Sequence, residues 1–215
     1  MEIRPASDRS LLVSFGEEIS LEAHRNVRRL LSAFEDRPTG ILNVHPAFAS
    51  VLIDFDPRRR SHRDVAELVE RRMAAPDQVA EGEPRTVKIP VSYGGQDGPD
   101  LEDVARHCGL SAARVIDLHT APLYLVYFLG FSPGFPYLGG LPGELATPRL
   151  ATPRKRVPAG SVAIGGSQTG IYPMESPGGW RIIGRTSMLL FNAEAEPPAL
   201  LRAGDCVRFL PGKIA

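Results

Sequence analysis

Turn-forming residues are concentrated in one quarter of this chain. Of its 21 glycines and 20 prolines, 12 glycines and 8 prolines fall between Gly130 and Gly184. Glycine supplies backbone conformations that other residues avoid, and proline can neither donate to a sheet ladder nor continue a helix. Such a segment can hold only short strands joined by tight turns. We therefore expect a β-barrel or β-sandwich in the C-terminal part of the chain.

Composition narrows the class of protein. The chain has 215 residues, of which 43% are hydrophobic and 23% are charged, as in a globular protein of one large or two modest domains. Lysine and arginine (25) balance aspartate and glutamate (25). Because there is no bulk charge to attract nucleic acid or an anionic membrane, we expect neither as a partner.

Cysteine usage and hydropathy indicate the compartment. Cys108 and Cys206 are the only cysteines, and they form no C-x-x-C motif, which suits a reducing cytoplasm. The first ten residues lack an apolar stretch, and the longest apolar run, Ala121–Phe131, is shorter than the roughly 20 residues of a spanning helix. These features argue against export and membrane insertion and favour a cytoplasmic protein.

The N-terminal residues predict alternating strands and helices in the order β-α-β-β-α. A closing strand could come from either side, which gives a small ferredoxin-like α/β sandwich domain over residues 1–83. The predicted elements are a strand at Leu11–Phe15, a helix capped by Ser20, a hairpin of Ile41–Val44 with Ser50–Phe55, and a helix started by the capping-box relative Ser61-x-x-Asp64.

A linker-like segment, Asp77–Pro84, predicts a domain boundary, and residues 84–215 form the second domain. Its first strand is expected near Val87–Tyr93. Two helices follow, Leu101–Cys108, which Gly109 stops, and Ala112–His119, which Ser111 caps. The remaining predicted strands are Leu123–Leu129, Ser161–Ile164, Trp180–Ile183, Met188–Phe191 and Cys206–Leu210.

Several catalytic motifs can be excluded. Gly130-Phe-Ser-Pro-Gly134 matches the G-x-S-x-G nucleophile elbow, but the elbow needs the backbone N–H that follows the serine, and Pro133 has none. No histidine follows His119 to complete a triad. The phosphate loop G-x-x-x-x-G-K-[ST] and any G-x-G pair are absent, which excludes a standard P-loop or dinucleotide site. Histidine and cysteine spacings predict no metal site.

Other segments have two interpretations. The turn Gly94–Asp100 could present backbone N–H groups to an anion, or could be a plain turn with Asp100 as N-cap. Arg154-Lys155-Arg156 could bind phosphate or carboxylate, or could be a solvated loop. His119 lies at a helix end, where it could be catalytic or structural. The polar, glycine-rich stretch Val157–Pro173 could line a pocket or form barrel corners.

Two long motifs, Phe128–Pro142 and Pro158–Pro173, carry a strong resemblance to a known family, with shorter matches at Val91–Leu101, Asp117–Thr120, Thr152–Arg154, Ser176–Trp180 and Leu201–Phe209. The sequence resembles the B subunits of bacterial ATP-dependent 5-oxoprolinase, a family also called allophanate hydrolase subunit 1 or the sporulation-kinase-inhibitor family. The resemblance covers roughly Val87 to Leu210, whereas the first 80 residues match in layout more than in letters.

This resemblance implies an α+β protein with a C-terminal cyclophilin-like β-barrel. It also implies a cytoplasmic enzyme that works with the A and C subunits of 5-oxoprolinase and cleaves the lactam 5-oxoproline to glutamate, with ATP, possible Mg²⁺ and no tightly bound cofactor. The resemblance leaves open which subunit holds the nucleotide. The family names leave two alternatives: an inhibitor of a sensor histidine kinase, and a carboxyltransferase half that acts on urea-like substrates.

By analogy with such a lactam hydrolase, we expect His119 to act as acid/base or oxyanion donor, and Gln168 with Tyr137 to bind polar groups of the substrate. The two side chains His119 and Gln168 would have to converge. The other residues expected to shape or line the pocket are Tyr93, Gly94, Gly95, Arg154, Gly165, Gly166, Ser167 and Thr169.

Overall fold

A computed structural model describes residues 1–75 and 84–212. It divides the chain into two compact units, Met1–Glu83 and Pro84–Ala215, each with its own core. Residues 77–83 of the predicted linker lie outside the described residues. None of the helices in the described parts is long and apolar enough to cross a membrane.

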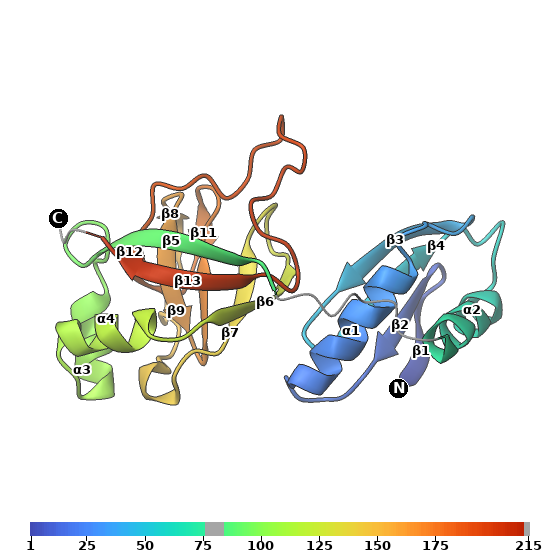
Figure 1. Cartoon of the computed structure of the whole chain (residues 1–215), viewed down its shortest axis with the longest axis horizontal. Coiled ribbons are helices and arrows are strands. Elements are labelled where there is room, and N and C mark those ends of the chain that lie inside the picture. The colour runs from blue at the N-terminus through green and yellow to red at the C-terminus, as the bar shows by residue number, and fades with distance from the viewer. Residues whose placement is uncertain (76–83, 213–215) are drawn as a thin grey trace. The chain divides into compact units, whose positions relative to one another are not determined.

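The N-terminal unit is a four-stranded antiparallel sheet with two helices (Figure 1). The strand order is β1-β2-β4-β3, and α1 and α2 pack on one face, where they cover a core of residues such as Val13, Val27 and Ile53. The elements are β1 (Glu2–Ser7), β2 (Ser10–Ser14), α1 (Leu21–Ala33), β3 (Ile41–Pro46), β4 (Ser50–Phe55) and α2 (His62–Ala74).

Local signals set these elements. The Ser20 hydroxyl accepts a hydrogen bond from the Ala23 N–H at 3.0 Å, and Ser61 and Asp64 form a reciprocal capping box, so both predicted helix starts are confirmed. The closing strand of the ferredoxin-like sheet comes from the N-terminus, as β1 beside β2. The predicted α+β fold class is confirmed for this unit.

The second unit is built on a closed barrel with the strand order β10-β7-β6-β13-β5-β12-β9 (Figure 1). Neighbouring strands are antiparallel except β5 and β13, which run parallel. The barrel strands are β5 (Thr86–Tyr93), β6 (Tyr124–Leu129), β7 (Pro136–Gly139), β9 (Ser161–Gly165), β10 (Gln168–Ile171), β12 (Arg181–Arg185) and β13 (Cys206–Pro211). This barrel confirms the cyclophilin-like β-barrel expected for the C-terminal part.

Helices α3 (Leu101–Cys108) and α4 (Ala112–Thr120) lie together beside the barrel, where α3 contacts β12 and α4 contacts β13 (Figure 1). Gly109 ends α3 in a left-handed conformation, and the Ser111 hydroxyl caps α4 by accepting from the Arg114 N–H at 3.2 Å. A short 3-10 turn, η1 (Gly143–Leu145), and a two-stranded sheet of β8 (Arg154–Val157) and β11 (Ser176–Gly178) complete the unit.

One predicted strand is wrong. Met188–Phe191 forms no strand, because Leu190 and Phe191 pair only locally with the returning segment: the Leu200 N–H donates to the Leu190 carbonyl, and Phe191 forms a single bridge with Ala199. Strands β1, β7, β8, β10 and β11 are additional to those that the sequence pattern predicts. All are short or poorly buried, so they lack the apolar alternation of a longer strand.

Hydrophobic side chains pack on both the inner and the outer face of the barrel wall. The interior core includes Val162, Ile164 and Ile171, and a second cluster made of Phe135, Val157, Ala163, Tyr172, Trp180 and Ile182 covers the outer face of β9 and β10. Successive side chains of a strand point to opposite faces. The position of a residue along β9 or β10 therefore decides which of the two environments it meets.

Candidate functional site

His119 is fully buried in the barrel interior, at the end of α4. Its Nδ1 lies 2.7 Å from the Tyr93 hydroxyl, and its Nε2 lies 2.9 Å from the Thr169 hydroxyl. Thr169 has a single hydrogen to donate, and the Ala163 carbonyl, 3.1 Å away, can only accept it. Nε2 of His119 therefore carries the proton and donates to Thr169, while Nδ1 accepts from Tyr93.

The electrostatics of this network agree with a neutral imidazole. Burial lowers the pKa of His119 from 6.5 to about 3 and raises the pKa of the Tyr93 hydroxyl above its ordinary value. With both ring nitrogens bonded and no solvent contact, His119 joins α4, β5 and β10 through hydrogen bonds. This geometry favours the structural interpretation of His119 over the catalytic one.

Gln168 and His119 do not converge. Thr169, the next residue along β10, points inward to His119, so Gln168 points to the outer face of the wall. Gly170 shares that outer face, where a Cβ atom would lie about 3 Å from the rings of Phe135 and Trp180. The structure thus brings Tyr93 and Thr169 to His119, whereas the Gln168 side chain lies on the opposite face of the barrel wall. The site that His119 and Gln168 were expected to share is therefore not formed.

Four more predicted residues belong to the outer wall. Gly166 and Ser167 form the exposed turn between β9 and β10, and Gly165 lies beneath Trp180, where a Cβ atom would come within 2.6 Å of the indole. Tyr137 stacks on Phe128 with ring centroids 4.5 Å apart. It also lines an aromatic cavity of about 190 Å³ that includes Tyr172, Trp180 and the guanidinium of Arg149, which lies 5.7 Å from the Trp180 ring.

The turn after β5 is tied to β12. Gly98 fits against the strand so closely that a Cβ atom would lie 2.1 Å from the Ile183 carbonyl oxygen, which explains why glycine is needed there. Gly94 receives a hydrogen bond from the Gly98 N–H and donates its own N–H to Ile183, while Gly95 is exposed in the turn. These contacts fix the path of the segment between Tyr93 and α3.

Arg154 is held by an internal ion pair. Its guanidinium donates to both carboxylate oxygens of the buried Asp100, at 2.9 and 2.7 Å, and the Ile182 N–H donates to the same carboxylate at 2.7 Å. Asp100 occupies the N-cap position of α3, as predicted, although its side chain makes no capping hydrogen bond and binds Arg154 and the Ile182 N–H instead. Most of the charge of Arg154 is thus compensated within the protein, although its side chain borders a small cavity of about 150 Å³.

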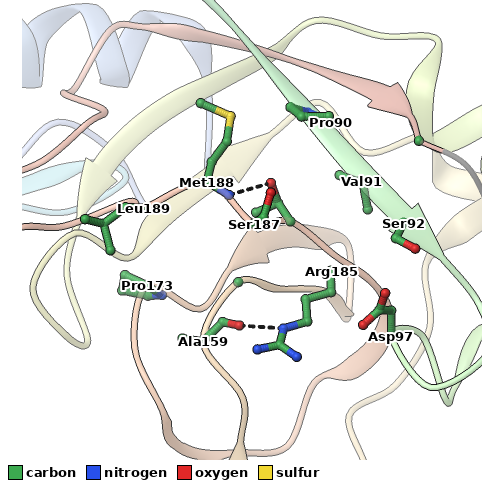
Figure 2. A pocket seen from close by; sticks show the side chains of 13 residues that line it. Pro90, Val91, Ser92, Asp97, Ala159, Pro173, Arg185, Ser187, Met188 and Leu189 are labelled. Carbon is green, nitrogen blue, oxygen red and sulfur yellow. Dashed lines mark hydrogen bonds between the residues drawn. The ribbon is translucent and has the colours of Figure 1, made fainter. Parts of the chain in front are cut away.

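A cavity of about 490 Å³ opens between the end of β5, the loop before β9 and the segment after β12 (Figure 2). The loop before β9 is set by Gly160, which has φ +80° and whose Cβ atom would lie 2.1 Å from the Thr186 carbonyl oxygen. Charged and apolar groups line the cavity together. They include Asp97, Arg185, Pro90, Val91, Pro173, Met188 and Leu189.

Asp97 and Arg185 carry no signal in the sequence that marks them as site residues. Asp97 lies inside a glycine turn whose backbone groups are the more obvious feature, and Arg185 directly follows a predicted strand. A single aspartate and a single arginine 88 positions apart form no recognisable motif, so only the fold brings them to one cavity. Over residues 1–75 and 84–212, no group of three or more His, Cys, Asp or Glu side chains is arranged to hold a metal ion.

These features define a two-unit protein with a closed barrel and a small-molecule-sized cavity at one edge of the barrel wall. The family model described as "Carboxyltransferase domain, subdomain C and D" matches residues 1–201, so the chain belongs to this family.

Two curated relatives, both named as the B subunit of 5-oxoprolinase, cover nearly the whole chain. The protein from Bacillus subtilis is 43% identical, over 97% of this chain and 92% of the relative. The protein from Escherichia coli O157:H7 is 46% identical, over 91% of this chain and 88% of the relative. A more distant relative, "Urea amidolyase" of Saccharomyces cerevisiae, is 26% identical over 97% of this chain but only 13% of its own length.

Solved structures extend the comparison. A crystal structure of TTHA0988 superposes on this chain with a TM-score of 0.86 at 43% identity. The superposition covers 96% of the present chain and 40% of the TTHA0988 chain. The urea carboxylase of Kluyveromyces lactis superposes with a TM-score of 0.77 at 23% identity, over 98% of this chain and 22% of that chain. The present chain thus spans less than half the length of either solved protein.

Proposed function

We propose that this chain is the B subunit of an ATP-dependent 5-oxoprolinase, which opens 5-oxoproline to glutamate. The observation that carries the proposal is the identity of 43% and 46% to two proteins named as this subunit, over 88% or more of their lengths and of this chain. Full-length similarity at this level makes a shared role in an assembly a stronger inference than similarity of fold, which many functions share.

The chemistry explains the need for ATP. A lactam is stabilised by amide resonance, so its carbonyl carbon is a poor electrophile. Transfer of the γ-phosphoryl group from ATP to the lactam oxygen releases ADP and activates that carbon. Water then adds to the carbon, the C–N bond breaks to free the amine, and a second water removes the phosphate. The site must therefore hold a carboxylate and manage the proton on the ring nitrogen.

The word "subunit" in the names of the relatives supports an enzyme that is active as an assembly. We assign the A and C subunits of 5-oxoprolinase as the partners, with ATP as the co-substrate of the whole complex. The sequence contains no standard phosphate loop, in agreement with a chain that does not hydrolyse ATP alone. The two free cysteines suit assembly in the cytoplasm.

The test is a reconstitution. The purified chain alone should show almost no ATP hydrolysis that depends on 5-oxoproline, and this activity should emerge when the A and C subunits are added. Mixtures of the A and C subunits without this chain are the control. Robust turnover by the single chain, or full activity of the other two subunits in its absence, would contradict the proposal.

A second candidate is a carboxyltransferase half that acts on urea-like amides. Its support is the 26% identity to the yeast urea amidolyase over nearly the whole of this chain. This candidate predicts that the complex transfers a carboxyl group from carboxybiotin to urea. A reconstituted complex that hydrolyses ATP with 5-oxoproline but shows no urea-dependent loss of carboxybiotin would exclude it.

A further inference from the structure

Two opposite charges line the 490 Å³ cavity without pairing with each other. Within the described parts of the chain, no carboxylate lies within 4.0 Å of the Arg185 guanidinium, and no cation lies within that distance of the Asp97 carboxylate. Other arginines near this edge have a carboxylate partner: Arg154 pairs with Asp100 and Arg156 pairs with Glu175. Arg185 and Asp97 are thus the charged groups of the cavity that are available to a ligand.

The Arg185 guanidinium is oriented by the protein. Its Nε donates to the Ala159 carbonyl at 2.9 Å, and Figure 2 shows the side chain extended across the cavity toward Ala159. This hydrogen bond leaves the two terminal Nη groups for a ligand. Because Gly160 fixes the loop against Thr186, the Ala159 carbonyl has a defined place. A guanidinium held in this way can bind a carboxylate with two parallel hydrogen bonds at a low cost in side-chain entropy.

Asp97 is placed by the turn that Gly98 holds against β12. The Gly98 N–H donates to the Gly94 carbonyl at 2.8 Å, which keeps the preceding carboxylate at the cavity wall. Asp97 itself makes no side-chain hydrogen bond to another residue in the described ranges. An ionised carboxylate can only accept hydrogen bonds, so its natural partner is an N–H group of the ligand.

The remaining walls suit a small ring. Pro90, Val91, Pro173 and Met188 add apolar surface to the same cavity, and Leu189, with 65% of its surface exposed, also lines it (Figure 2). Apolar walls with a few placed polar groups, in a volume of about 300–1,000 Å³, are typical of small-molecule sites. A ligand that matches all three features carries a carboxylate, an N–H group and apolar ring carbons.

We propose that this cavity binds a carboxylate-bearing cyclic amide, with its carboxylate on the Nη groups of Arg185 and its ring N–H on Asp97. The assignment rests on the proposed function, for which 5-oxoproline is such a molecule. Asp97 takes the N–H proton as the lactam oxygen attacks phosphorus, and it returns this proton to the nitrogen as the C–N bond breaks. Arg185 is a binding residue, and Asp97 is a catalytic residue that acts as base and then as acid.

Kinetics of the reconstituted complex test the assignment. Arg185→Gln should raise KM for 5-oxoproline on the order of 100-fold, the scale of a charge-assisted hydrogen-bond pair, with KM for ATP unchanged, and Arg185→Lys should recover part of the loss. Asp97→Asn should lower kcat on the order of 100-fold, the usual contribution of one general acid/base. Unchanged KM for 5-oxoproline in Arg185→Gln would overturn the assignment.

Matched controls come from the same unit. Arg208 likewise donates to a backbone carbonyl, that of Ala121, at 2.7 Å, and Asp117 is a carboxylate on α4. Neither lines the cavity. Arg208→Gln and Asp117→Asn should leave both kinetic constants unchanged. Melting temperatures of all variants should match that of the wild type, because Arg185 is exposed and Asp97 is only partly buried.

Direct binding separates failure of the site from failure of the proposed function. Addition of 5-oxoproline to the ¹⁵N-labelled full chain should shift the amide signals of Gly160, Ser187 and Met188, and Arg185→Gln should abolish these shifts. Shifts confined to other parts of the protein, or none at all, would overturn the site. If the shifts are seen while the wild-type complex fails to turn over 5-oxoproline, the site stands and the proposed function is refuted.

Discussion

Replacement of His119 by alanine should destabilise the barrel and not affect its chemistry directly. The imidazole packs against the rings of Phe209 and Tyr124, with centroids 4.6 and 5.5 Å away, so its loss opens a cavity that costs about 2–4 kcal/mol. The Tyr93 hydroxyl also loses its acceptor, which adds about 1–3 kcal/mol. The sum of about 3–7 kcal/mol corresponds to a fall of roughly 10–25 °C in the melting temperature of a domain of this size.

The pH dependence of the free energy of unfolding provides a second test of the role of His119. Unfolded histidine binds a proton below its ordinary pKa of 6.5, whereas folded His119, with its pKa lowered by burial, does so only near about 3. The unfolded state therefore binds more protons between these values, and wild-type stability decreases as pH falls through that window, by at most about 1.4 kcal/mol per pH unit from this group. In His119→Ala this dependence is absent, so the stability difference from the wild type should narrow between pH 7 and pH 5.

The assay uses the single tryptophan. Trp180 lies on the barrel wall, so its fluorescence reports unfolding of this unit separately from the N-terminal unit, where the pKa of the buried His24 is also lowered, to about 4. His107→Ala, at an exposed histidine in the last turn of α3, is the matched control and should change stability by no more than about 0.5 kcal/mol. An unchanged melting temperature together with loss of activity per folded molecule would refute the structural role and support a catalytic one.

Three further substitutions test other features of the barrel unit. Ser132→Ala should leave the reconstituted rate within a few fold and the melting temperature unchanged or slightly higher, because the hydroxyl is buried without a hydrogen bond to any described residue. Labelling of Ser132 by a serine-directed phosphonate would contradict the expectation that Ser132 is no nucleophile. Arg154→Gln should cost about 3–5 kcal/mol in a chemical denaturation curve, since it leaves the carboxylate of Asp100 buried without its cation; a loss below about 1 kcal/mol would show that the pair is solvated. Gly160→Ala should raise KM for 5-oxoproline by displacing the loop from Thr186, with little change in KM for ATP, and equal changes in both constants would argue against the cavity as the site of the lactam.

Short-range signals were sufficient to predict much of the fold. Ser20, Ser61 and Ser111 each begin a helix as their sequence context indicates, because a cap depends only on the next three residues. The sequence left the closing strand, β1, without a location, because most of its side chains are exposed and it lacks an apolar alternation. Strand β1 is placed in the sheet by its pairing with β2, and the sequence of β1 alone does not indicate this pairing.

The candidate site was harder to predict than the fold. Gln168 and Thr169 are adjacent in a polar stretch, and only the direction of β10 decides which of them faces His119. Alternation with the buried Ile171 was the available signal, since Thr169 and Ile171 share a face. Asp97 and Arg185 could not be selected, because what distinguishes them is the lack of an ion-pair partner in the described parts of the folded chain, and pairing is a property of three-dimensional structure.

The most direct test of the proposed function measures the formation of glutamate from 5-oxoproline. The A and C subunits are mixed with ATP and with either the wild-type chain, the chain carrying both Arg185→Gln and Asp97→Asn, or no chain. We predict that glutamate and ADP form in equal amounts with the wild-type chain, and that almost none of either forms without a chain. The double variant should lower both rates at least as much as Asp97→Asn alone, on the order of 100-fold. Equal rates of glutamate formation in the three mixtures would contradict the claim that this chain carries part of the 5-oxoproline site.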